Sequence, residues 1–257
     1  MESLSRNPFC RPFSFEGTRE HGVLLLHGFT ATPGTLFPLG QALFQKTGWY
    51  ISAPLLPGHG RTPEEMEKTR WHDWLRAAQH SFDEMSRRCR DVSVVGLSMG
   101  GALTLLLAET RPVRRAVPIA AALSVHNSKI HLANFLWPFC RYIGEEKEAE
   151  QKEQPRPDFL QEYNAAYQRT PVHCLADLDR LMRLARRGLP RIHCPVLAVR
   201  AGKDETVHPR SSDWIMAGVS SPKKQLLELP ESPHVCTLGP EREVLFDAVA
   251  RFLTEAL

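Results

Sequence analysis

Residues 96–100 read Gly-Leu-Ser-Met-Gly, a pattern that could place a reactive hydroxyl on a sharp turn. They follow the apolar run Val92–Val95 and precede the helix-forming run Ala102–Ala108, which together indicate a strand, a turn and a helix. The glycines on either side of Ser98 remove the β-carbons that would crowd such a turn. Because a serine hydroxyl is a weak nucleophile, the chain must also supply a general base, an orienting carboxylate and groups that stabilise an oxyanion.

His234 is the candidate general base. It follows the predicted strand Gln225–Leu229 across a short loop and precedes the last predicted helix, so we expect its imidazole at the same sheet edge as Ser98. Most of the other histidines lack such a placement. His59 lies in the turn-rich segment Leu56–Gly60 and is interpreted as structural, holding a loop by a hydrogen bond.

The acid that orients the imidazole must lie just past the end of a strand. Asp204 is the best candidate, because it follows the predicted strand Val196–Val199 across a short turn at the edge where His234 is expected. Asp213 and Glu231 are the rivals. Asp213 falls on the following helix, and Glu231 is so close to His234 in the chain that the loop would have to double back.

Two backbone amides are expected to stabilise the oxyanion. The first belongs to Met99, the residue after the nucleophile. The second should come from the loop His27–Thr30 that follows the predicted strand Val23–Leu26, where Gly28 allows the turn and Phe29 presents its amide. The Phe29 side chain could also form one wall of an acyl site.

Apolar runs alternate with segments of helical periodicity, which predicts an α/β fold with a mostly parallel central sheet and helices on both faces. An added strand is expected at roughly Phe9–Phe15. Pro240 is expected in the first turn of the last helix, whose inner face should include Val244 and Leu245. The six central strands are predicted at Val23–Leu26, Tyr50–Ala53, Val92–Val95, Ala116–Ile119, Val196–Val199 and Gln225–Leu229. A helix should follow Thr69, with a buried stripe formed by Trp71, Trp74, Leu75, Ala78, Phe82 and Met85.

Residues 124–188 show no convincing strand and predict a small helical cap inserted between two parts of the α/β core, residues 1–123 and 189–257. Such an insertion would lie over the carboxyl edge of the sheet, where open α/β sheets bind ligands. Its charged run Glu145–Gln154 is interpreted as a solvated helix face. The aromatic and aliphatic residues of the insertion could line an apolar substrate pocket or could pack the insertion onto the core; they are Phe135, Leu136, Trp137, Phe139 and Tyr142.

The composition of the 257-residue chain narrows the class of protein. The net charge of +3 is dispersed rather than gathered in tracts, which gives nucleic-acid binding little support. The six cysteines have no metal-like spacing and suggest reduced thiols, and no signal peptide or membrane-spanning run is evident, so we expect a cytoplasmic protein without stable membrane insertion. No cofactor or metal is implied, and the oligomeric state is left open.

With these residues assembled, the chain resembles the α/β-hydrolase fold, and within it the bacterial carboxylesterase and monoacylglycerol lipase family. The resemblance covers nearly all of Gly22–Leu253. It implies a Ser98–His234–Asp204 triad, Phe29 and Met99 as oxyanion donors, and a small helical cap over an acyl pocket. Relatives often carry Ser-Gly-His where this chain has Ser-Pro-His at 232–234. The segments that carry the resemblance are Leu24–Thr30, Pro57–Gly60, Gly96–Gly101, the Asp204 turn with Pro209, His234-Val235 and Thr237-Leu238.

The expected function is hydrolysis of short- to medium-chain esters or monoacylglycerols through an acyl-enzyme on Ser98. A small-molecule ester or lipid would be the partner of the site. Because one fold supports many reactions, the alternatives are a peptidase, thioesterase, acyltransferase or carbon–carbon bond hydrolase with the same triad, or a silent ligand-binding homologue. An epoxide hydrolase or haloalkane dehalogenase is disfavoured, since those relatives have aspartate at the position of Ser98.

Overall fold

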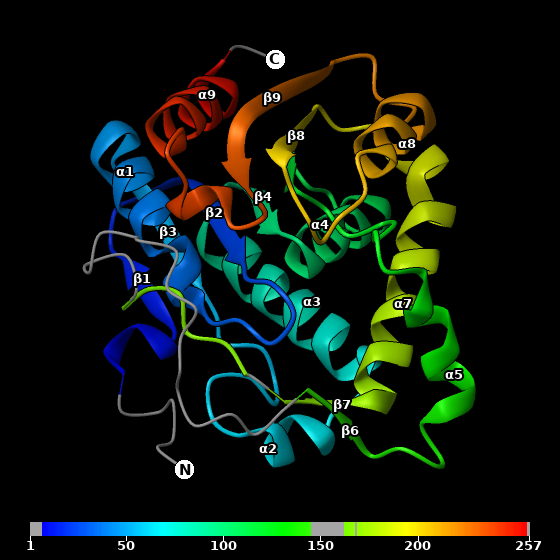
Figure 1. Cartoon of the computed structure of the whole chain (residues 1–257). Coiled ribbons are helices and arrows are strands. Elements are labelled where there is room, and N and C mark those ends of the chain that lie inside the picture. The colour runs from blue at the N-terminus through cyan, green and yellow to red at the C-terminus, as the bar shows by residue number, and fades with distance from the viewer. Residues whose placement is uncertain (1–6, 145–161, 168, 256–257) are drawn as a thin grey trace.

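A computed structural model describes residues 7–144, 162–167 and 169–255, and a seven-stranded sheet forms its centre (Figure 1). Neighbouring strands are parallel except at the β1 edge, where β1 runs antiparallel to β3. All six central strands predicted from the sequence are confirmed. In spatial order the strands are β1 (Phe13–Phe15), β3 (Trp49–Ala53), β2 (Thr18–Leu26), β4 (Asp91–Leu97), β5 (Ala116–Ile119), β8 (Val196–Lys203) and β9 (Lys224–Pro233).

Helices cover both faces of the sheet, because side chains alternate between the two faces along each strand. In β2, Leu24 and Leu26 pack in one apolar cluster, whereas Val23 and Leu25 pack in the other. The first cluster is completed by α3 (Trp71–Arg88), α4 (Met99–Thr110), α7 (Val172–Gly188) and α8 (Arg210–Gly218). The second is completed by α1 (Phe37–Thr47) and α9 (Arg242–Thr254).

The predicted helix after Thr69 is α3, and its stripe faces the core as expected. Trp74, Ala78, Phe82 and Met85 are buried, and Trp71 and Leu75 pack against the same cluster. At the start of α3, the Asp73 carboxylate accepts the Arg70 N–H at 2.9 Å, which satisfies one of the donors that a helix leaves unpaired at its beginning.

The added strand predicted near the start of the chain is β1, which begins only at Phe13 because Pro8–Cys10 form a 3-10 turn. Two details of the last predicted helix were wrong. Pro240 precedes α9 rather than occupying its first turn. Val244 is 56% exposed, because the inner face of α9 is built one residue later, from Leu245 and the residues spaced from it at helical intervals.

The predicted insertion contains short elements and one long helix. They are the 3-10 turn Ser128–Leu132, α5 (Ala133–Leu136), β6 (Tyr142–Ile143), β7 (Thr170–Pro171) and α7, and β6 pairs antiparallel with β7. Helix α7 packs between α4 and α5 and contributes to the main core cluster through Cys174, Leu178, Leu181, Met182 and Ala185. The last helix of the segment is therefore a layer of the core, and the division at residues 124 and 188 stays a prediction. The run Glu145–Gln154 lies outside the described residues.

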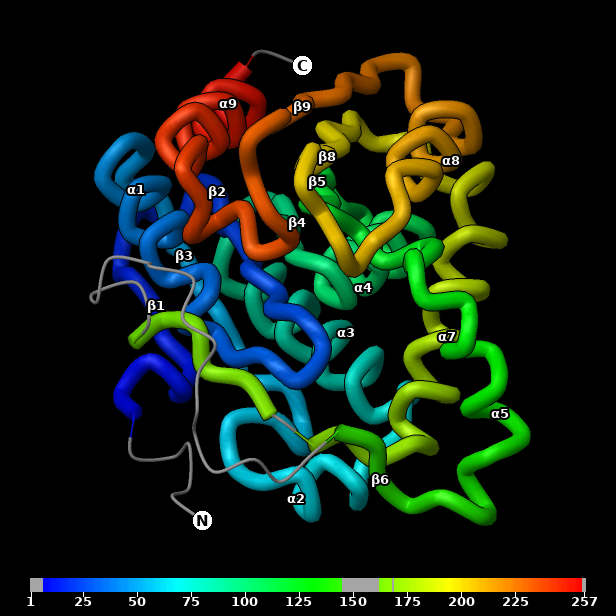
Figure 2. Tube along the Cα trace, viewed as in Figure 1, coloured from blue at the N-terminus to red at the C-terminus, as the bar shows by residue number. Residues whose placement is uncertain are grey.

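The chain path brings two segments that are far apart in the sequence close together, namely segment 162–167 and the loop after β2 (Figure 2). The remaining elements are α2 (Pro63–Glu67) and the 3-10 turns Pro33–Leu36, Leu189–Arg191 and Cys236–Leu238.

All six cysteines are free thiols. Among the described helices, none has both the length and the apolar character that crossing a membrane requires.

Candidate active site

Ser98 lies at the junction of β4 and α4 in a strained backbone conformation. Its φ of 58° and ψ of −115° fall in a region that residues with a β-carbon rarely adopt. Strand β5 and the chain just after it hold Ser98 there, because the Ser98 N–H donates to the Ile119 carbonyl at 2.9 Å and the Ser98 carbonyl accepts the Ala122 N–H at 3.1 Å. The residue is 8% exposed. The strain and its fixation are what a nucleophile elbow requires.

The glycines around Ser98 are required by close backbone packing, as predicted. A β-carbon at Gly96 would lie 2.1 Å from the Gly100 carbonyl oxygen, and one at Gly100 would lie 1.9 Å from the Leu26 carbonyl oxygen. These distances are far below any van der Waals contact, and the atoms in the way belong to the backbone. Helix α4 can therefore approach β2 and β4 only because these positions lack side chains.

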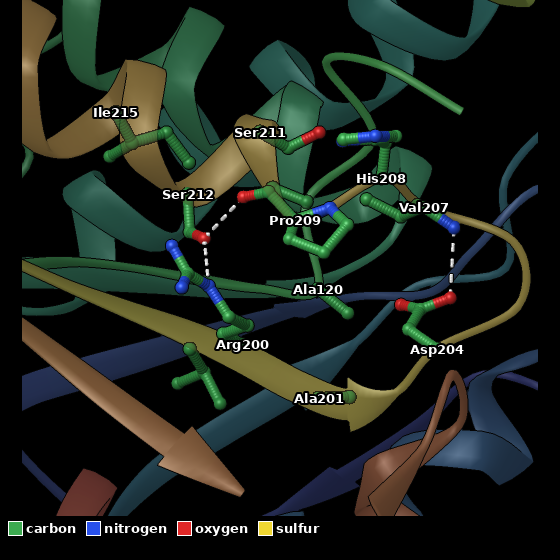
Figure 3. A pocket seen from close by; sticks show the side chains of 12 residues that line it. Ala120, Arg200, Ala201, Asp204, Val207, His208, Pro209, Ser211, Ser212 and Ile215 are labelled. Carbon is green, nitrogen blue, oxygen red and sulfur yellow. Dashed lines mark hydrogen bonds between the residues drawn. The ribbon is translucent and has the colours of Figure 1, made fainter. Parts of the chain in front are cut away.

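His234 and Asp204 meet at the carboxyl edge of the sheet, from the ends of β9 and β8. The His234 Nδ1 lies 2.7 Å from the Asp204 Oδ2. The other carboxylate oxygen of Asp204 accepts the N–H groups of Thr206 and Val207, both at 2.8 Å. Figure 3 shows the second of these bonds. The Asp204 side chain is only 5% exposed. Because Nδ1–H faces the carboxylate, the Nε2 of the neutral imidazole is left as a proton acceptor.

The loop that carries Asp204 is fixed by the chain after β5. Val125 and Val207 form an isolated antiparallel bridge, and the His126 N–H donates to the Thr206 carbonyl at 3.0 Å. A small cavity behind this loop has a volume of about 10 Å³ and is lined by Ala120, Val199 and Pro209 among others (Figure 3). It is no larger than a water molecule, so it has no room for a substrate.

The two rival carboxylates lie elsewhere. Asp213 pairs with Arg200, and Glu231 pairs with Lys203. Both carboxylates are 63% exposed and neither bonds to His234. Of the three acids considered, the structure brings only Asp204 together with the candidate base.

Glu241 fixes the loop that precedes His234, a role that no motif in the sequence predicted. Its Oε2 accepts the Ser232 hydroxyl at 2.7 Å and the Glu231 N–H at 2.9 Å. Ser232 is completely buried, and Pro233 still pairs with Lys203 in the sheet. The Ser-Pro-His segment is thus held on both sides. The available signal was an acidic residue immediately before the last helix, where a carboxylate can accept nearby N–H groups.

The loop after β2 approaches Ser98 closely. A β-carbon at Gly28 would lie 3.4 Å from the Ser98 Cβ. Thr30 has a φ of 59°, and its hydroxyl donates to the Phe29 carbonyl at 2.6 Å. Within the described part of the chain, the amides of Phe29 and Met99 donate no hydrogen bond, so both N–H groups are available to an incoming oxygen.

Two buried histidines lie under this loop. The His27 Nε2 accepts the Leu56 N–H at 3.0 Å, so its Nδ1–H donates to the Gly28 carbonyl at 2.9 Å. The His59 Nδ1 lies 3.0 Å from the Pro57 carbonyl, which confirms the predicted role of His59 in holding a loop. Burial lowers the pKa of His27 to about 3 and that of His59 to about 4. Both imidazoles are therefore neutral at physiological pH.

These two histidines predict a loss of stability in mild acid. The unfolded chain binds protons at both positions near pH 6.5, whereas the folded chain excludes them down to about pH 4, so stability is present above pH 6.5 and is lost as the pH falls. Each histidine should contribute about 1.4 kcal/mol per pH unit to this slope. Urea unfolding at pH 5 and pH 7 measures it. His59→Gln should reduce the dependence of the free energy of unfolding on pH. The control His80→Gln, which changes an exposed residue of α3, should leave that dependence unchanged. Equal pH dependence in the unchanged protein and both variants would contradict the prediction.

Four of the five predicted pocket residues of the insertion are exposed, and the fifth, Tyr142, is half-buried and donates its hydroxyl to Glu67 of α2 at 2.7 Å. Phe135 is 75% exposed, Trp137 51% and Phe139 89%, and Leu136 is also exposed. They lie on α5 and the chain after it, and α5 packs on the side of α7 away from α4 (Figure 1). These side chains neither pack the insertion onto the core nor meet Ser98 in the described part of the chain, and a contribution to an acyl pocket stays a prediction. Trp137 lines an open groove of about 340 Å³ together with Glu67, Arg70, Arg141 and His173.

The described residues contain no group of three or more histidine, cysteine, aspartate or glutamate side chains that could hold a metal ion. The chemistry that the arrangement can perform is acyl transfer through a serine, with an oriented imidazole and two free amides at the same sheet edge.

Comparison with known proteins gives consistent matches. Residues 18–241 match the family described as serine aminopeptidase, S33. The chain is 35% identical to a thermostable monoacylglycerol lipase of Bacillus sp. (strain H-257), over 91% of this chain and 90% of the relative. It is 31% identical to a carboxylesterase of Bacillus subtilis (strain 168), over 95% and 96%. A solved structure described with two metagenome-derived lipolytic enzymes is 30% identical, with a TM-score of 0.84 over 96% of this chain and 99% of that one.

Proposed function

Because this chain belongs to the serine aminopeptidase S33 family of α/β-hydrolases, we propose that it hydrolyses monoacylglycerols and short- to medium-chain esters with a Ser98–His234–Asp204 triad. The chain is a serine ester hydrolase. The observation that carries the assignment of the triad is the 2.7 Å contact of His234 with Asp204, at the sheet edge where Ser98 occupies its strained turn.

In the proposed mechanism, the Ser98 hydroxyl attacks the ester carbonyl while the His234 Nε2 takes its proton. The buried Asp204 carboxylate holds Nδ1–H and stabilises the imidazolium that forms. His234 then gives the proton to the leaving alcohol. A water molecule, deprotonated by the same imidazole, attacks the acyl-enzyme, and the imidazolium returns this proton to the Ser98 oxygen as the bond to the acyl carbon breaks and the carboxylic acid leaves. No further acid or base is needed for the cycle.

The oxyanion is proposed to bind the amides of Phe29 and Met99. Met99 is the first residue of α4, so its N–H precedes the helical hydrogen-bond ladder and points out of the helix start. Phe29 is placed by the turn in which the Ala31 N–H donates to the Gly28 carbonyl at 3.3 Å. Donors fixed in advance in this way lower the barrier, because they need no rearrangement as charge develops.

The substrate class is supported by the two Bacillus relatives, one named a monoacylglycerol lipase and the other a carboxylesterase. A cytoplasmic location is part of the proposal and is supported by the six free cysteines. Small-molecule esters or lipids are the proposed partners of the site.

Hydrolysis of a p-nitrophenyl ester series from acetate to palmitate, and of 1-monoacylglycerols of the same chain lengths, tests the proposal. We expect turnover by the unchanged protein, with an optimum at short to medium chains for p-nitrophenyl esters and release of glycerol from the matching monoacylglycerols. The Ser98→Ala variant, run in parallel, measures the background. Turnover of peptides or thioesters with none of any oxygen ester would contradict the proposal.

A further inference from the structure

The loop that carries Phe29 is strained and must be held by its surroundings. Thr30 keeps a φ of 59°, in the left-handed region that favours glycine. Such a conformation persists only where neighbouring groups fix it. Because an oxyanion donor must be placed to within a fraction of an ångström, whatever fixes Thr30 also affects the position of the Phe29 amide.

Tyr167 contacts this loop directly. Its backbone N–H donates to the Thr30 carbonyl at 3.4 Å, so the chain of the insertion reaches the strained residue itself. Segment 162–167 is also anchored at its other end. The centroid of the Tyr163 ring lies 4.3 Å from that of the Phe9 ring, and the Tyr163 ring stacks on Phe37. The Asn7 side chain donates to the Glu162 carbonyl at 2.7 Å. Segment 162–167 is therefore fixed at both ends.

Tyr167 also holds the second loop that supports Phe29. Its hydroxyl donates to the Gly58 carbonyl at 2.8 Å and accepts the Arg61 N–H at 3.0 Å. Gly58 and Gly60 both have positive φ, so this loop too is tightly turned. His59 lies between these two glycines, and its ring packs edge-on against the Phe29 ring, with 6.4 Å between the ring centroids. Burial raises the pKa of Tyr167 to about 12, so the hydroxyl stays protonated and able to donate.

We propose that Tyr167 is a positioning residue for the oxyanion site, which joins the insertion to the two loops that place the Phe29 amide. The proposal rests on the proposed function, in which that amide is an oxyanion donor. Tyr167 acts on Thr30 through one bond and on the His59 loop through two, and it forms no hydrogen bond with Ser98, His234 or Asp204. Its effect should therefore appear in transition-state stabilisation rather than in substrate binding.

Tyr167→Phe removes both hydroxyl bonds and keeps the ring, and Tyr163→Phe is the matched control. Tyr163 lies in the same segment and loses the same atom, but its hydroxyl has no hydrogen bond in the described part of the chain. For Tyr167→Phe we expect kcat per active site to fall about 10-fold or more, with KM within about twofold, because a displacement of roughly 1 Å can cost about 100-fold. Tyr163→Phe should match the unchanged protein.

Three measurements separate positioning from a general loss of structure. Titration with a p-nitrophenyl phosphonate measures the number of active sites that can react. Misfolded protein therefore lowers the number of active sites and leaves kcat per active site unchanged. The affinity of a trifluoromethyl ketone, which forms an oxyanion on the serine, should weaken in proportion to kcat for Tyr167→Phe. The rate of phosphonylation should fall as well, since the phosphoryl oxygen occupies the same place.

The possible outcomes are distinct. A fall in kcat together with weaker ketone binding supports the proposal. An unchanged kcat, a rise in KM alone, or a loss confined to the number of active sites would overturn it. If the unchanged protein hydrolyses no ester, the proposed function fails, whereas the phosphonylation rates of Tyr167→Phe and Tyr163→Phe still decide whether Tyr167 positions the site.

Discussion

Ser98→Ala is expected to abolish ester hydrolysis, with kcat lower by about 10⁴- to 10⁶-fold. The hydroxyl oxygen is the proposed nucleophile, and nothing else in the arrangement can form the acyl-enzyme. The fold should persist, because the hydrogen bonds that fix residue 98 use its backbone N–H and carbonyl. Alanine at the same φ carries a steric strain similar to that of serine. Steady-state kinetics on the best ester, with circular dichroism of both proteins, checks this result.

The control for this variant is Ser93→Ala, which removes a buried hydroxyl from the same strand at the position that pairs with Val23. It should retain activity close to that of the unchanged protein. A fluorophosphonate should label the peptide containing Ser98 in the unchanged protein and in the Ser93 variant, and not in Ser98→Ala. Activity of Ser98→Ala above about 1% of the unchanged protein would refute the assignment of the nucleophile, because losing a triad serine costs several powers of ten.

Asp204→Asn is expected to lower kcat by about 10⁴-fold at neutral pH. The reason lies in the two amides that bind the Asp204 Oδ1. They would hold the carbonyl oxygen of an asparagine and turn its NH2 group toward His234. The imidazole would then have to accept at Nδ1 and carry its proton on Nε2, the tautomer that cannot deprotonate Ser98.

Asp213→Asn is the matched control for this prediction, because Asp213 is a rival acid that is exposed and pairs with Arg200. It should leave kcat within about twofold, as expected of a surface ion pair. The measurement is kcat and KM for both variants on one ester, with binding of a substrate analogue to establish that the pocket is intact. If Asp204→Asn kept activity within tenfold, or if Asp213→Asn lost as much, the role of Asp204 would be wrong.

Local sequence was sufficient for the elements that carry the chemistry. The central strands are short apolar runs bounded by turn residues, and each of the six appears where it was predicted. Glycine at positions 96 and 100 already implied a crowded turn, and the packing distances confirm the physical reason. These features depend on steric rules and residue order, which the sequence contains directly.

The sequence pattern was least informative where a side chain could lie on more than one face. Val244 is apolar but lies one residue ahead of the inner face of α9, so hydrophobicity alone misplaced it. Phe135 on the short helix α5 and Phe139 in the chain after it are large and apolar, yet both are exposed, and their contribution to an acyl pocket stays a prediction. A helix of four residues has too few turns to define a buried face from its sequence pattern.

The sequence by itself determined the residue types of the site, their order along the chain and the sheet edge at which Ser98, Asp204 and His234 were expected. Only the tertiary structure showed which carboxylate contacts His234, because the sequence favoured Asp204 over Asp213 and Glu231 by its place after a strand without fixing any distance. The supports of the site were likewise invisible in the chain. Glu241 and Tyr167 act through hydrogen bonds to segments brought close by folding, and such contacts depend on how the loops pack rather than on any local pattern.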